Sequence, residues 1–429
     1  MSSVFRSITI LLLCLAVNIS LIAQDKPKVF RYTGFVEYLN NTWIPYGETN
    51  KMLGFEDWQN QSGIYNRFNF WVTPVKNLEL YVGMRNNFLF GPLITSYNDL
   101  YTGLHLNYSY IEMASFDNGY FDLTFKIADG NSYMFYTNFD RANLKWTLKK
   151  FELTVGRQRI NWGTNLIWNP NDIFNAYNYF DFNYVERPGS DAVLIELFTG
   201  DFSSIQLAAK VGNNLILDQF AVDTIVLKKQ DFYTAAAMYR FNLWNYDFQF
   251  FGGKMEDDFT AGAGWAGSIA GTGFTGEVSW FSDIEDFYDS SNVWIASIGI
   301  NYTFRNSIFI NFSGIYNSAG ATGPVNAGFG NFLGSFSSMF SSSLNVKNLT
   351  RSRMNIFGQI SYPVTPLINL DLASIFNPYD KSVFVGPSVN FSLTDNISLM
   401  LVGQLFWGDP LTEYGDIGQM FFLDLKWSF

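Results

Sequence analysis

The sequence predicts an all-β fold, a single transmembrane antiparallel up-and-down β-barrel, and three observations carry this prediction. Aromatic residues make up 19% of the 429 residues, and Phe alone numbers 44. Most of the chain divides into segments in which apolar and polar residues alternate, separated by Gly, Asn and Ser. Beyond residue 23, no uncharged stretch comes near the ~20 apolar residues of a helical membrane span. Short alternating segments, aromatic bands and polar turns are typical of barrels in membranes.

The first 23 residues have the layout of a cleaved secretory signal peptide. A single basic residue, Arg6, precedes an apolar run over Ile8–Val17, and the small residue Ala23 follows. A membrane-spanning helix is the alternative, but the apolar run is about half the length that a span needs. A lipoprotein site at Cys14 is disfavoured by the leucine before it. Because Cys14 is the only cysteine, cleavage leaves residues 24–429 as a barrel without thiols.

The last nine residues predict the final strand of the barrel. Every second residue from Phe421 to Phe429 is apolar, and the residues between them are mostly polar. Lipid is expected to cover the apolar face, since no later segment does so. The terminal phenylalanine resembles the C-terminal signal of outer-membrane barrels, which makes Trp427 and Phe429 candidate assembly residues. The expected partners are therefore the barrel assembly machinery, outer-membrane lipid and lipopolysaccharide, and the expected location is the outer membrane.

About twenty strands are predicted, with eighteen as the alternative, because Gly119–Leu148 also fits one hairpin fewer. Short turns such as Val75-Lys76 alternate along the chain with long connections such as Asn41–Ser62. This alternation predicts short periplasmic turns on one rim, together with both termini, and long extracellular loops on the other. The predicted strands are Val29–Asn40, Gly63–Pro74, Asn77–Phe90, Gly103–Ser115, Gly119–Ala128, Ser132–Leu148, Lys150–Trp162, Gly189–Thr199, Asp201–Gly212, Gln230–Leu243, Trp244–Met255, Asp258–Ala270, Gly271–Ser282, Ser291–Arg305, Asn306–Asn317, Leu349–Pro363, Pro366–Asn377, Ser382–Thr394, Asn396–Gly408 and Gly418–Phe429.

Charged residues alternate with apolar ones on several strands, which places them inside the barrel. A barrel this wide cannot be filled by strand side chains alone, so water or loops are expected inside. The charges either hydrate and cross-link the inner wall or bind anionic or polyhydroxylated solutes by bidentate hydrogen bonds. The candidate pore-lining residues are Arg67, Arg85, Arg141, Lys145, Arg157, Arg159, Arg351, Arg353, Glu79 and Asp371.

Two long loops are candidates to narrow the pore. In Gly163–Pro188, Asn169-Pro170 predicts the start of a short helix that runs through Tyr179. Folded inward, this loop forms a constriction; folded outward, it forms a lid. In Ser318–Asn348, apolar residues at helical spacing predict an amphipathic helix that caps the mouth, plugs the lumen or lies on the membrane. The candidate constriction residues are Trp168, Asp172, Phe174, Tyr177 and Tyr179.

One stretch of the chain carries a family resemblance. The run Gly156–Gly163 reads Gly-Arg-Gln-Arg-Ile-Asn-Trp-Gly, and Asn169–Asp172 follows as Asn-Pro-Asn-Asp. This arrangement resembles barrel families related to the alginate-export porins. The resemblance implies an outer-membrane channel whose lumen arginines, here Arg157 and Arg159, meet an anionic or sugar-like solute. The acids interleaved with the arginines mean that alginate itself is not implied.

Strand alternation conflicts with that implication. It places Arg157 and Arg159 on the same face as Leu153 and Val155, which is the lipid face. A β-bulge at Gly156 is needed to turn the two arginines into the lumen. Without such a bulge, the implied role of both arginines fails.

Composition argues against several other functions. The net charge of −11 disfavours a nucleic acid partner. His105 is the only histidine, predicted on a strand beside Asn107 and Ser109, and no acid or base at convincing spacing supports an enzyme. With one histidine and no mature cysteine, neither a metal site nor a cofactor is expected. Too few residues separate Ala23 from the first strand for a plug domain of the kind used in active import.

The predicted function is a passive outer-membrane channel for small polar, anionic or sugar-like solutes, constricted by inward-folded loops. Two alternatives stay open: a channel for hydrophobic solutes, and a non-conducting barrel that acts in assembly or surface interaction. The sequence leaves the solute and the oligomeric state undetermined.

Overall fold

The computed structural model describes residues 29–176, 179–182, 184, 186–221, 224–285, 292–324 and 345–429. The predicted signal peptide, Tyr177 and most of the predicted amphipathic helix lie outside these ranges. The described strands are β1 Phe30–Ile44, β2 Gln59–Val75, β3 Leu78–Phe90, β4 Thr124–Gly130, β5 Tyr133–Leu148, β6 Phe151–Gln158, β7 Ser190–Gly200, β8 Ser203–Ala221, β9 Thr224–Leu243, β10 Tyr246–Met255, β11 Asp258–Ile269, β12 Thr272–Asp283, β13 Val293–Thr303, β14 Phe309–Asn317, β15 Met354–Thr365, β16 Ile368–Phe376, β17 Val383–Ser392, β18 Ile397–Trp407 and β19 Gln419–Ser428. The described helices are α2 Glu48–Met52, α3 Pro92–Gly103, α4 Tyr110–Ala114 and the short 3₁₀ turn η1 Val346–Asn348.

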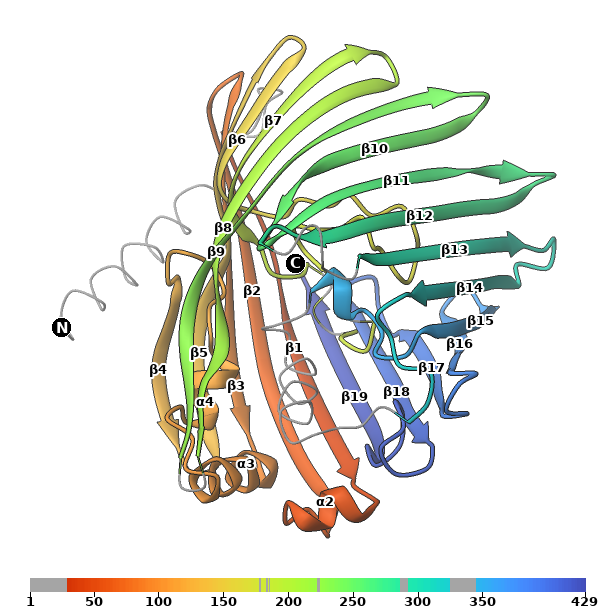
Figure 1. The fold of residues 1–429 in the computed structure, drawn as a ribbon. Helices are drawn as coiled ribbons and strands as arrows, with labels where there is room; N and C mark the ends of the chain where they lie inside the picture. The colour runs from red at the N-terminus through yellow and green to blue at the C-terminus, as the bar shows by residue number, and fades with distance from the viewer. Residues whose placement is uncertain are drawn as a thin grey trace, which may run out of the picture.

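The strands form one antiparallel sheet that closes on itself (Figure 1). β1 is hydrogen-bonded to β2 on one side and to β19 on the other, so the first and last strands seal the ring. Eighteen strands form this ring, β1 to β3 and β5 to β19, because β3 pairs directly with β5. A closed sheet pairs its backbone groups within the wall, which the hydrocarbon core of a membrane requires. The predicted up-and-down barrel is therefore confirmed.

The remaining strand explains the difference from the count of twenty. β4 pairs only with the first six residues of β5, Tyr133–Asn138, and takes no place of its own in the ring. The predicted strand at residues 103–115 is wrong, because this stretch follows α3 and contains α4. A capping box starts α4: the Ser109 hydroxyl accepts from the Glu112 N–H, and the Ser109 N–H donates to the Glu112 carboxylate. His105 accordingly lies in a loop, with a left-handed φ of 50°, and not on a strand.

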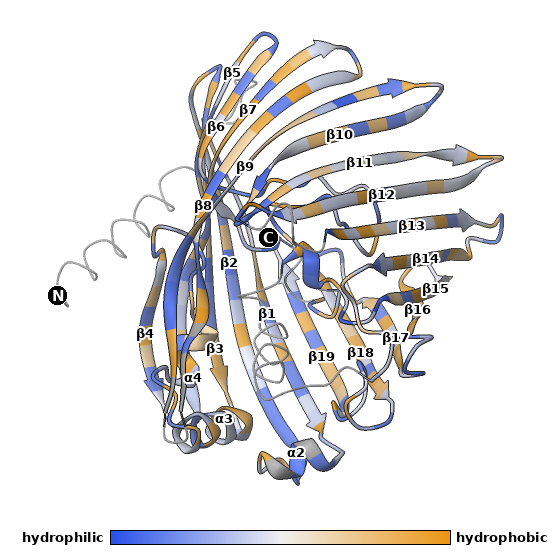
Figure 2. Ribbon diagram, in the orientation of Figure 1, coloured by the Kyte–Doolittle hydropathy of each residue, from blue (hydrophilic) through white to orange (hydrophobic). Residues whose placement is uncertain are grey.

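The two faces of the wall differ as the alternation predicts. On β3, Leu80 is exposed on the outside, while Arg85 on the opposite face is buried. On β16, Leu370 and Leu372 are exposed, and the intervening Asp371 faces inward. Figure 2 shows hydrophobic and hydrophilic residues alternating along the strands throughout the ring. None of the helices in the described residues is long and apolar enough to cross a membrane.

The C-terminal residue completes the seam between β1 and β19. The backbone N–H and C=O of Phe429 both pair with Gly34, at 2.9 Å each. A Cβ atom on Gly34 would lie 2.8 Å from the Phe429 ring, so this approach requires glycine. The same ring lies 5.9 Å from that of Phe68 on β2, between centroids. The last side chain thus covers the outer surface of the first two strands.

The two rims differ in the length of their connections, as predicted, with one exception: the long connection predicted over Asn213–Lys229 is wrong, because β8 continues to Ala221 and β9 begins at Thr224. Tight turns join β5 to β6, β9 to β10 and β11 to β12, and several of their residues have left-handed φ values, among them Lys149, Trp244 and Asn245. The other rim carries the long connections, including α2, α3 and α4, which lie together at the lower end of Figure 1. We refer to it as the long-loop rim.

Gly156 on β6 has a backbone conformation that favours glycine. Its φ is +112°, and a Cβ there would lie 2.3 Å from the carbonyl oxygen of Ala142 on β5. The pairing register of β5 and β6 is unbroken at this position, so the predicted bulge is absent. Val155 is exposed, whereas Arg157, two residues further on, is buried and borders the cavity inside the barrel. Only glycine adopts the positive φ of Gly156 at low cost.

Gly156→Ala is expected to destabilise the barrel by roughly 1–3 kcal/mol, because alanine is strained at this φ and collides with the β5 backbone. Urea unfolding of the detergent-solubilised protein, followed by tryptophan fluorescence, measures the change. Gly358→Ala is the matched control, since a Cβ at Gly358 meets no atom within 4 Å. Equal unfolding midpoints for the two variants would contradict the assignment.

Candidate functional site

The loop between β6 and β7, residues 159–189, folds into the barrel. Trp162, Trp168 and Phe174 are almost fully buried, and they pack in one cluster with inner-wall residues that include Phe281 and Phe357. Trp162 meets the ring of Phe174 edge to face at 4.8 Å, and Trp168 meets Phe357 at 6.2 Å. Of the two arrangements predicted for this loop, the inward one is therefore observed. It fills the part of the lumen that faces β8 to β18.

The predicted helix in this loop is wrong for the residues that the structure describes. Residues 169–176 form turns, with the Asp172 N–H bonded to the Asn169 carbonyl at 3.1 Å. The reason is that the polar groups of this stretch bind the wall instead of one another. Asn171 donates from its side chain to the Ala263 carbonyl at 3.0 Å and accepts from Ser279 at 2.7 Å. These wall contacts replace the local hydrogen bonds of a helix.

Glu277 on β12 anchors the first half of the loop. Its buried carboxylate accepts hydrogen bonds from the backbone N–H groups of Thr164, Asn165 and Asn171, the latter two at 3.0 and 2.9 Å. A carboxylate that accepts several backbone N–H bonds is strongly held. The sequence carries no signal for the role of Glu277, because nothing in β12 indicates which loop contacts it.

Asp172 lies in the same buried region. One carboxylate oxygen accepts from the Trp162 N–H at 3.3 Å. Burial raises the pKa of Asp172 to about 7, although the nearby Arg159 opposes this rise. The loop thus contains an acid whose charge the surroundings disfavour at neutral pH. Asp172 is a structural residue of the loop core and does not face open space.

The second half of the loop is held by two arginines that were expected to line a pore. Arg67 makes a bidentate pair with Asp140, at 2.5 and 2.9 Å, and Tyr184 donates to the same carboxylate at 2.7 Å. Arg141 donates to the backbone carbonyls of Glu186 and Arg187, at 2.5 and 2.9 Å. Burial, followed by the charge of Asp140, raises the pKa of Tyr184, so its hydroxyl remains a proton donor. Both arginines therefore position the loop.

Arg157 is also fully engaged. It binds Asp191 through Nε and Nη2 at 2.8 and 2.9 Å, and it binds Asp117 through Nη1 at 2.6 Å. It also donates to the carbonyls of Phe121 and Phe139. These contacts hold residues 117–121 against the ends of β6 and β7, where Arg157 and Asp191 lie. A guanidinium with two carboxylate partners has little capacity left for a solute.

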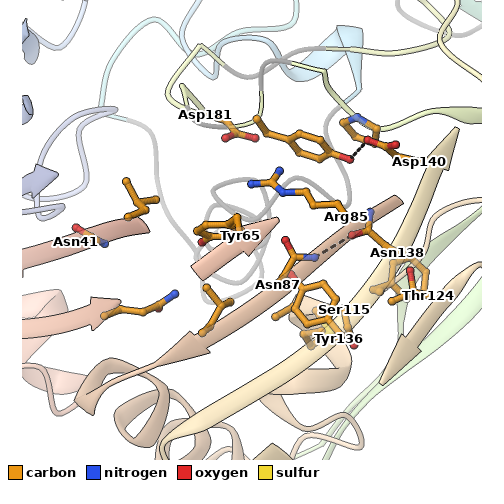
Figure 3. Close-up of a pocket in the computed structure, with 18 of the residues that line it drawn as sticks. Asn41, Tyr65, Arg85, Asn87, Ser115, Thr124, Tyr136, Asn138, Asp140 and Asp181 are labelled. Carbon is orange, nitrogen blue, oxygen red and sulfur yellow. Dashed lines mark hydrogen bonds between the residues drawn. The ribbon is translucent and has the colours of Figure 1, made fainter. Parts of the chain in front are cut away.

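A cavity of about 340 Å³ remains on the opposite side of the lumen, and Arg85 projects into it (Figure 3). The cavity lies between β1, β2, β3 and β5, the segment 113–118 and the end of the inward loop. The Arg85 guanidinium carbon lies 4.3 Å from the ring centre of Tyr184 and 4.7 Å from that of Tyr65. Among the described residues, no carboxylate forms an ion pair with Arg85, in contrast to Arg67 and Arg157.

Polar groups surround Arg85 in this cavity. Asn87 and Asn138 face it from β3 and β5 and are joined by a hydrogen bond of 2.9 Å. Asn41 lies on the β1 side, and Asp181 lies at the end of the inward loop. Burial raises the pKa of Asp181, and the charge of Arg85 opposes this rise. The arrangement offers one cation, amide donors and acceptors, and tyrosine rings to a molecule that enters.

The other candidate pore residues are dispersed. Lys145 pairs with Glu152 at 2.6 Å and lies opposite Glu79 on β3, and Asp371 accepts from Asn369 at 2.6 Å. Arg351 and Arg353 precede β15 and do not lie on it, because the strand begins at Met354. Arg159 follows β6 near Asp172. Of the predicted set, only Arg85 and Arg157 contribute to the wall of the cavity. The remaining constriction candidate, Tyr179, packs edge to face against Phe357 at 5.2 Å.

Comparison with known proteins shows the fold of the chain. No family model and no curated protein matches the sequence. Among solved structures, OccK11 (OpdR) of Pseudomonas aeruginosa is similar, with a TM-score of 0.55 and 10% identity over 93% of this chain and 95% of that one. The outer membrane protein OpdK of the same organism has a TM-score of 0.53 and 9% identity over 93% and 99%. OccAB1 of Acinetobacter baumannii has a TM-score of 0.53 and 12% identity over 94% and 97%. The chain therefore shares nearly its whole length with β-barrels of this architecture.

Asp172→Asn is expected to stabilise the protein at pH 8 and to have little effect at pH 4. The folded state raises the pKa of this carboxyl to about 7, whereas the unfolded chain ionises near pH 4. The wild type therefore loses stability as the pH rises from 4 to above 7, by up to about 4 kcal/mol. Asparagine avoids this loss and can still accept from the Trp162 N–H. Urea unfolding midpoints at both pH values measure the effect; a wild type that gains stability over this range relative to the variant would contradict it.

Proposed function

We propose that this protein is a passive outer-membrane channel for small polar solutes that carry a negative charge or several hydroxyl groups. The cavity at Arg85 is the proposed selective passage, narrowed by the inward loop at residues 159–189. Arg85 gives the main support for this function. Its side chain projects into the cavity, and no carboxylate among the described residues forms an ion pair with it.

The surroundings of Arg85 favour one mode of binding. The rings of Tyr65 and Tyr184 lie over the guanidinium at 4.7 and 4.3 Å, which is cation–π distance. Rings that cover the faces of a guanidinium leave its N–H edge for hydrogen bonds in the plane. A carboxylate or a pair of neighbouring hydroxyl groups matches that edge bidentately. Asn87 and Asn138 add donors and acceptors for hydroxyl groups.

The other candidate residues receive different roles in this proposal. Arg67, Arg141 and Arg157 position the inward loop and the wall segment 117–121, as their hydrogen bonds indicate. The remaining charged residues are proposed to line the approaches to the cavity: Arg159, Arg351, Arg353, Lys145, Glu79 and Asp371. Because acids are interleaved with these cations, the preference for anions is expected to be moderate.

Export and assembly are part of the proposal. Residues 1–23 would direct the chain to the periplasm and then be cleaved off, and Trp427 and Phe429 would act as the signal read by the barrel assembly machinery. The pairing of Phe429 with Gly34 supports this role, because the signal residue also closes the ring. Outer-membrane lipid and lipopolysaccharide are the proposed surroundings of the apolar outer face. The relation to alginate-export porins is likewise proposed, with solute binding moved from Arg157 to Arg85.

A channel for hydrophobic solutes is the second candidate, and one observation favours it. Part of the cavity wall is apolar, formed by Leu39, Trp43, Leu89 and Phe422. An aromatic carboxylate would contact both the polar part of the wall at Arg85 and this apolar part. A hydrocarbon would contact only the apolar part. Competition by small carboxylates against ion flow through the channel separates the two candidates, since only the first predicts a block.

Arg85→Ala is expected to lower the anion-over-cation permeability ratio by roughly sevenfold in planar bilayers. Removing a unit positive charge about 7 Å from a passing ion raises the energy of an anion and lowers that of a cation by about 0.6 kcal/mol each in a water-like dielectric. The reversal potential in a salt gradient measures this ratio. Arg85→Lys keeps the charge but not the bidentate edge, so it should restore ion preference without restoring carboxylate block. Arg305→Ala, in an exposed turn, is the matched control. A folded wild type that carries no current, or an unchanged ratio in Arg85→Ala, would overturn the proposal.

Glu277→Gln is expected to raise single-channel conductance and its fluctuations. Glutamine has an NH₂ donor in place of one acceptor oxygen, so it cannot accept all the backbone N–H hydrogen bonds that the carboxylate accepts. This loss weakens the attachment of the loop by roughly 1–3 kcal/mol. A loosened loop leaves a wider passage. Glu152→Gln is the control, because Glu152 pairs with Lys145 on the strands and holds no part of the loop. Current traces of Glu277→Gln that match those of the wild type would exclude this loop as the constriction.

A further inference from the structure

A group of polar side chains lies on the outside of the barrel, on the adjacent strands β1, β2, β3 and β5. On β2, Asn66 shares a face with the exposed Ile64, while the neighbouring Arg67 on the other face is fully buried inside. On β3, Asn86 lies between Met84 and Phe88 on the outer face. We call the whole group the outer polar stripe: Tyr38, Asn40, Thr42, Asn60, Ser62, Asn66, Asn86 and Thr137.

The members of the outer polar stripe are hydrogen-bonded to one another across the strands. Thr137 donates to Asn86 at 2.6 Å, Asn86 donates to Asn66 at 3.0 Å, and Asn66 donates to the Phe35 carbonyl at 3.1 Å. Nearer the long-loop rim, Asn40 and Asn60 form a second network with their neighbours Ser62 and Thr42. Ser62 and Thr137 are buried within these networks, whereas the four asparagines are partly exposed. An amide group has two N–H donors and a carbonyl with two acceptor sites, so the asparagines retain unused hydrogen-bonding capacity.

The rest of the outer wall shows how unusual this composition is. On β18 and β19, the outward residues are Leu401, Leu423, Leu425 and Trp427, all exposed and apolar. β13 and β14 present Ile298, Ile300 and Phe312 in the same way. Lipid suits such surfaces, but amide groups with unused hydrogen-bonding capacity are costly in hydrocarbon. The outer polar stripe is therefore poorly suited to be covered by lipid.

We propose that the outer polar stripe is an interface at which a second copy of this chain packs. The stripe contains no charged residue, so two copies do not repel each other there. Its amides are both donors and acceptors, which makes the surface complementary to itself. Two copies in one membrane are related by a rotation axis along the membrane normal. Equivalent groups of the two copies therefore lie at the same depth in the membrane. Asn66 and Asn86 of one copy then face polar groups at the same level of the other.

An apolar groove at the end of the stripe nearest the long-loop rim extends this surface. It is lined by Phe88, Phe90, Tyr133, Trp58 and Pro92, with a volume of about 830 Å³. Phe90 lies directly opposite Ser62 of the stripe in the β2–β3 register. Trp58 is 67% exposed beside the groove and is available to insert into the groove of a partner. Polar pairs in the membrane and aromatic packing near the rim together provide a specific contact.

Cysteine cross-linking tests the interface directly, because the predicted mature chain has no cysteine of its own. Asn66→Cys places a thiol in the stripe, and Ile298→Cys places one on β13, on the opposite side of the ring. A short bis-maleimide applied to isolated outer membranes is expected to yield a product of twice the chain mass for Asn66→Cys only. A difference in gel mobility between unheated and heated samples verifies that both variants are folded.

Three results would overturn the proposal: equal cross-linking at both sites, a product whose mass indicates a different protein, or a nitroxide at position 66 as accessible to a lipid-phase quencher as one at 298. A second variant, Asn66→Leu with Asn86→Leu, is expected to weaken self-association roughly tenfold, measured by light scattering in detergent. An unweakened association in this double variant would place the contact elsewhere. These outcomes do not depend on conduction, so they are separate from the test of the channel.

Discussion

The closure of the sheet between β1 and β19 is the constraint on which the rest of this structure depends. Hydrocarbon offers no hydrogen-bond partner to a strand edge, so the wall must pair with itself. The resulting eighteen-strand ring is wider than its own side chains can fill. The loop at residues 159–189 therefore enters the lumen, where Trp162, Trp168 and Phe174 find an apolar inner wall. Ring size thus requires the loop, and the loop in turn determines where the cavity lies.

Inside this ring, the loop also decides the state of each cation. Arg67 binds the carboxylate that supports the end of the loop, and Arg141 binds the end of the loop itself. Arg157 binds two aspartates. A buried guanidinium with carboxylate partners contributes rigidity, because its donors are saturated. Arg85 differs, since its neighbours in the cavity are tyrosine rings and amides. The paired arginines of this barrel and Arg85 are therefore distinguished by their partners and not by their position on the wall.

The same requirement applies to the outside of the wall. A side chain that faces lipid is stable when it is apolar, and most outward residues meet this condition. The outer polar stripe on β1, β2, β3 and β5 does not, although its amides are joined in networks. A protein surface supplies hydrogen-bond partners that lipid lacks. On both faces of the wall, each polar group therefore needs a neighbour that replaces water as its hydrogen-bond partner.

The sequence by itself determined the barrel class, the arrangement of the two rims and the outward faces of most strands, because these follow from an alternation of period two that is local to each segment. It mispredicted residues 103–115, where the capping box of Ser109 and Glu112 favours α4 over the alternation. Tertiary structure alone decided which arginines stay unpaired. The partners of Arg67 and Glu277 are 73 and more than 100 residues away in the chain, and the two aspartates that bind Arg157 are 34 and 40 residues away, so no local pattern of side chains encodes these pairs.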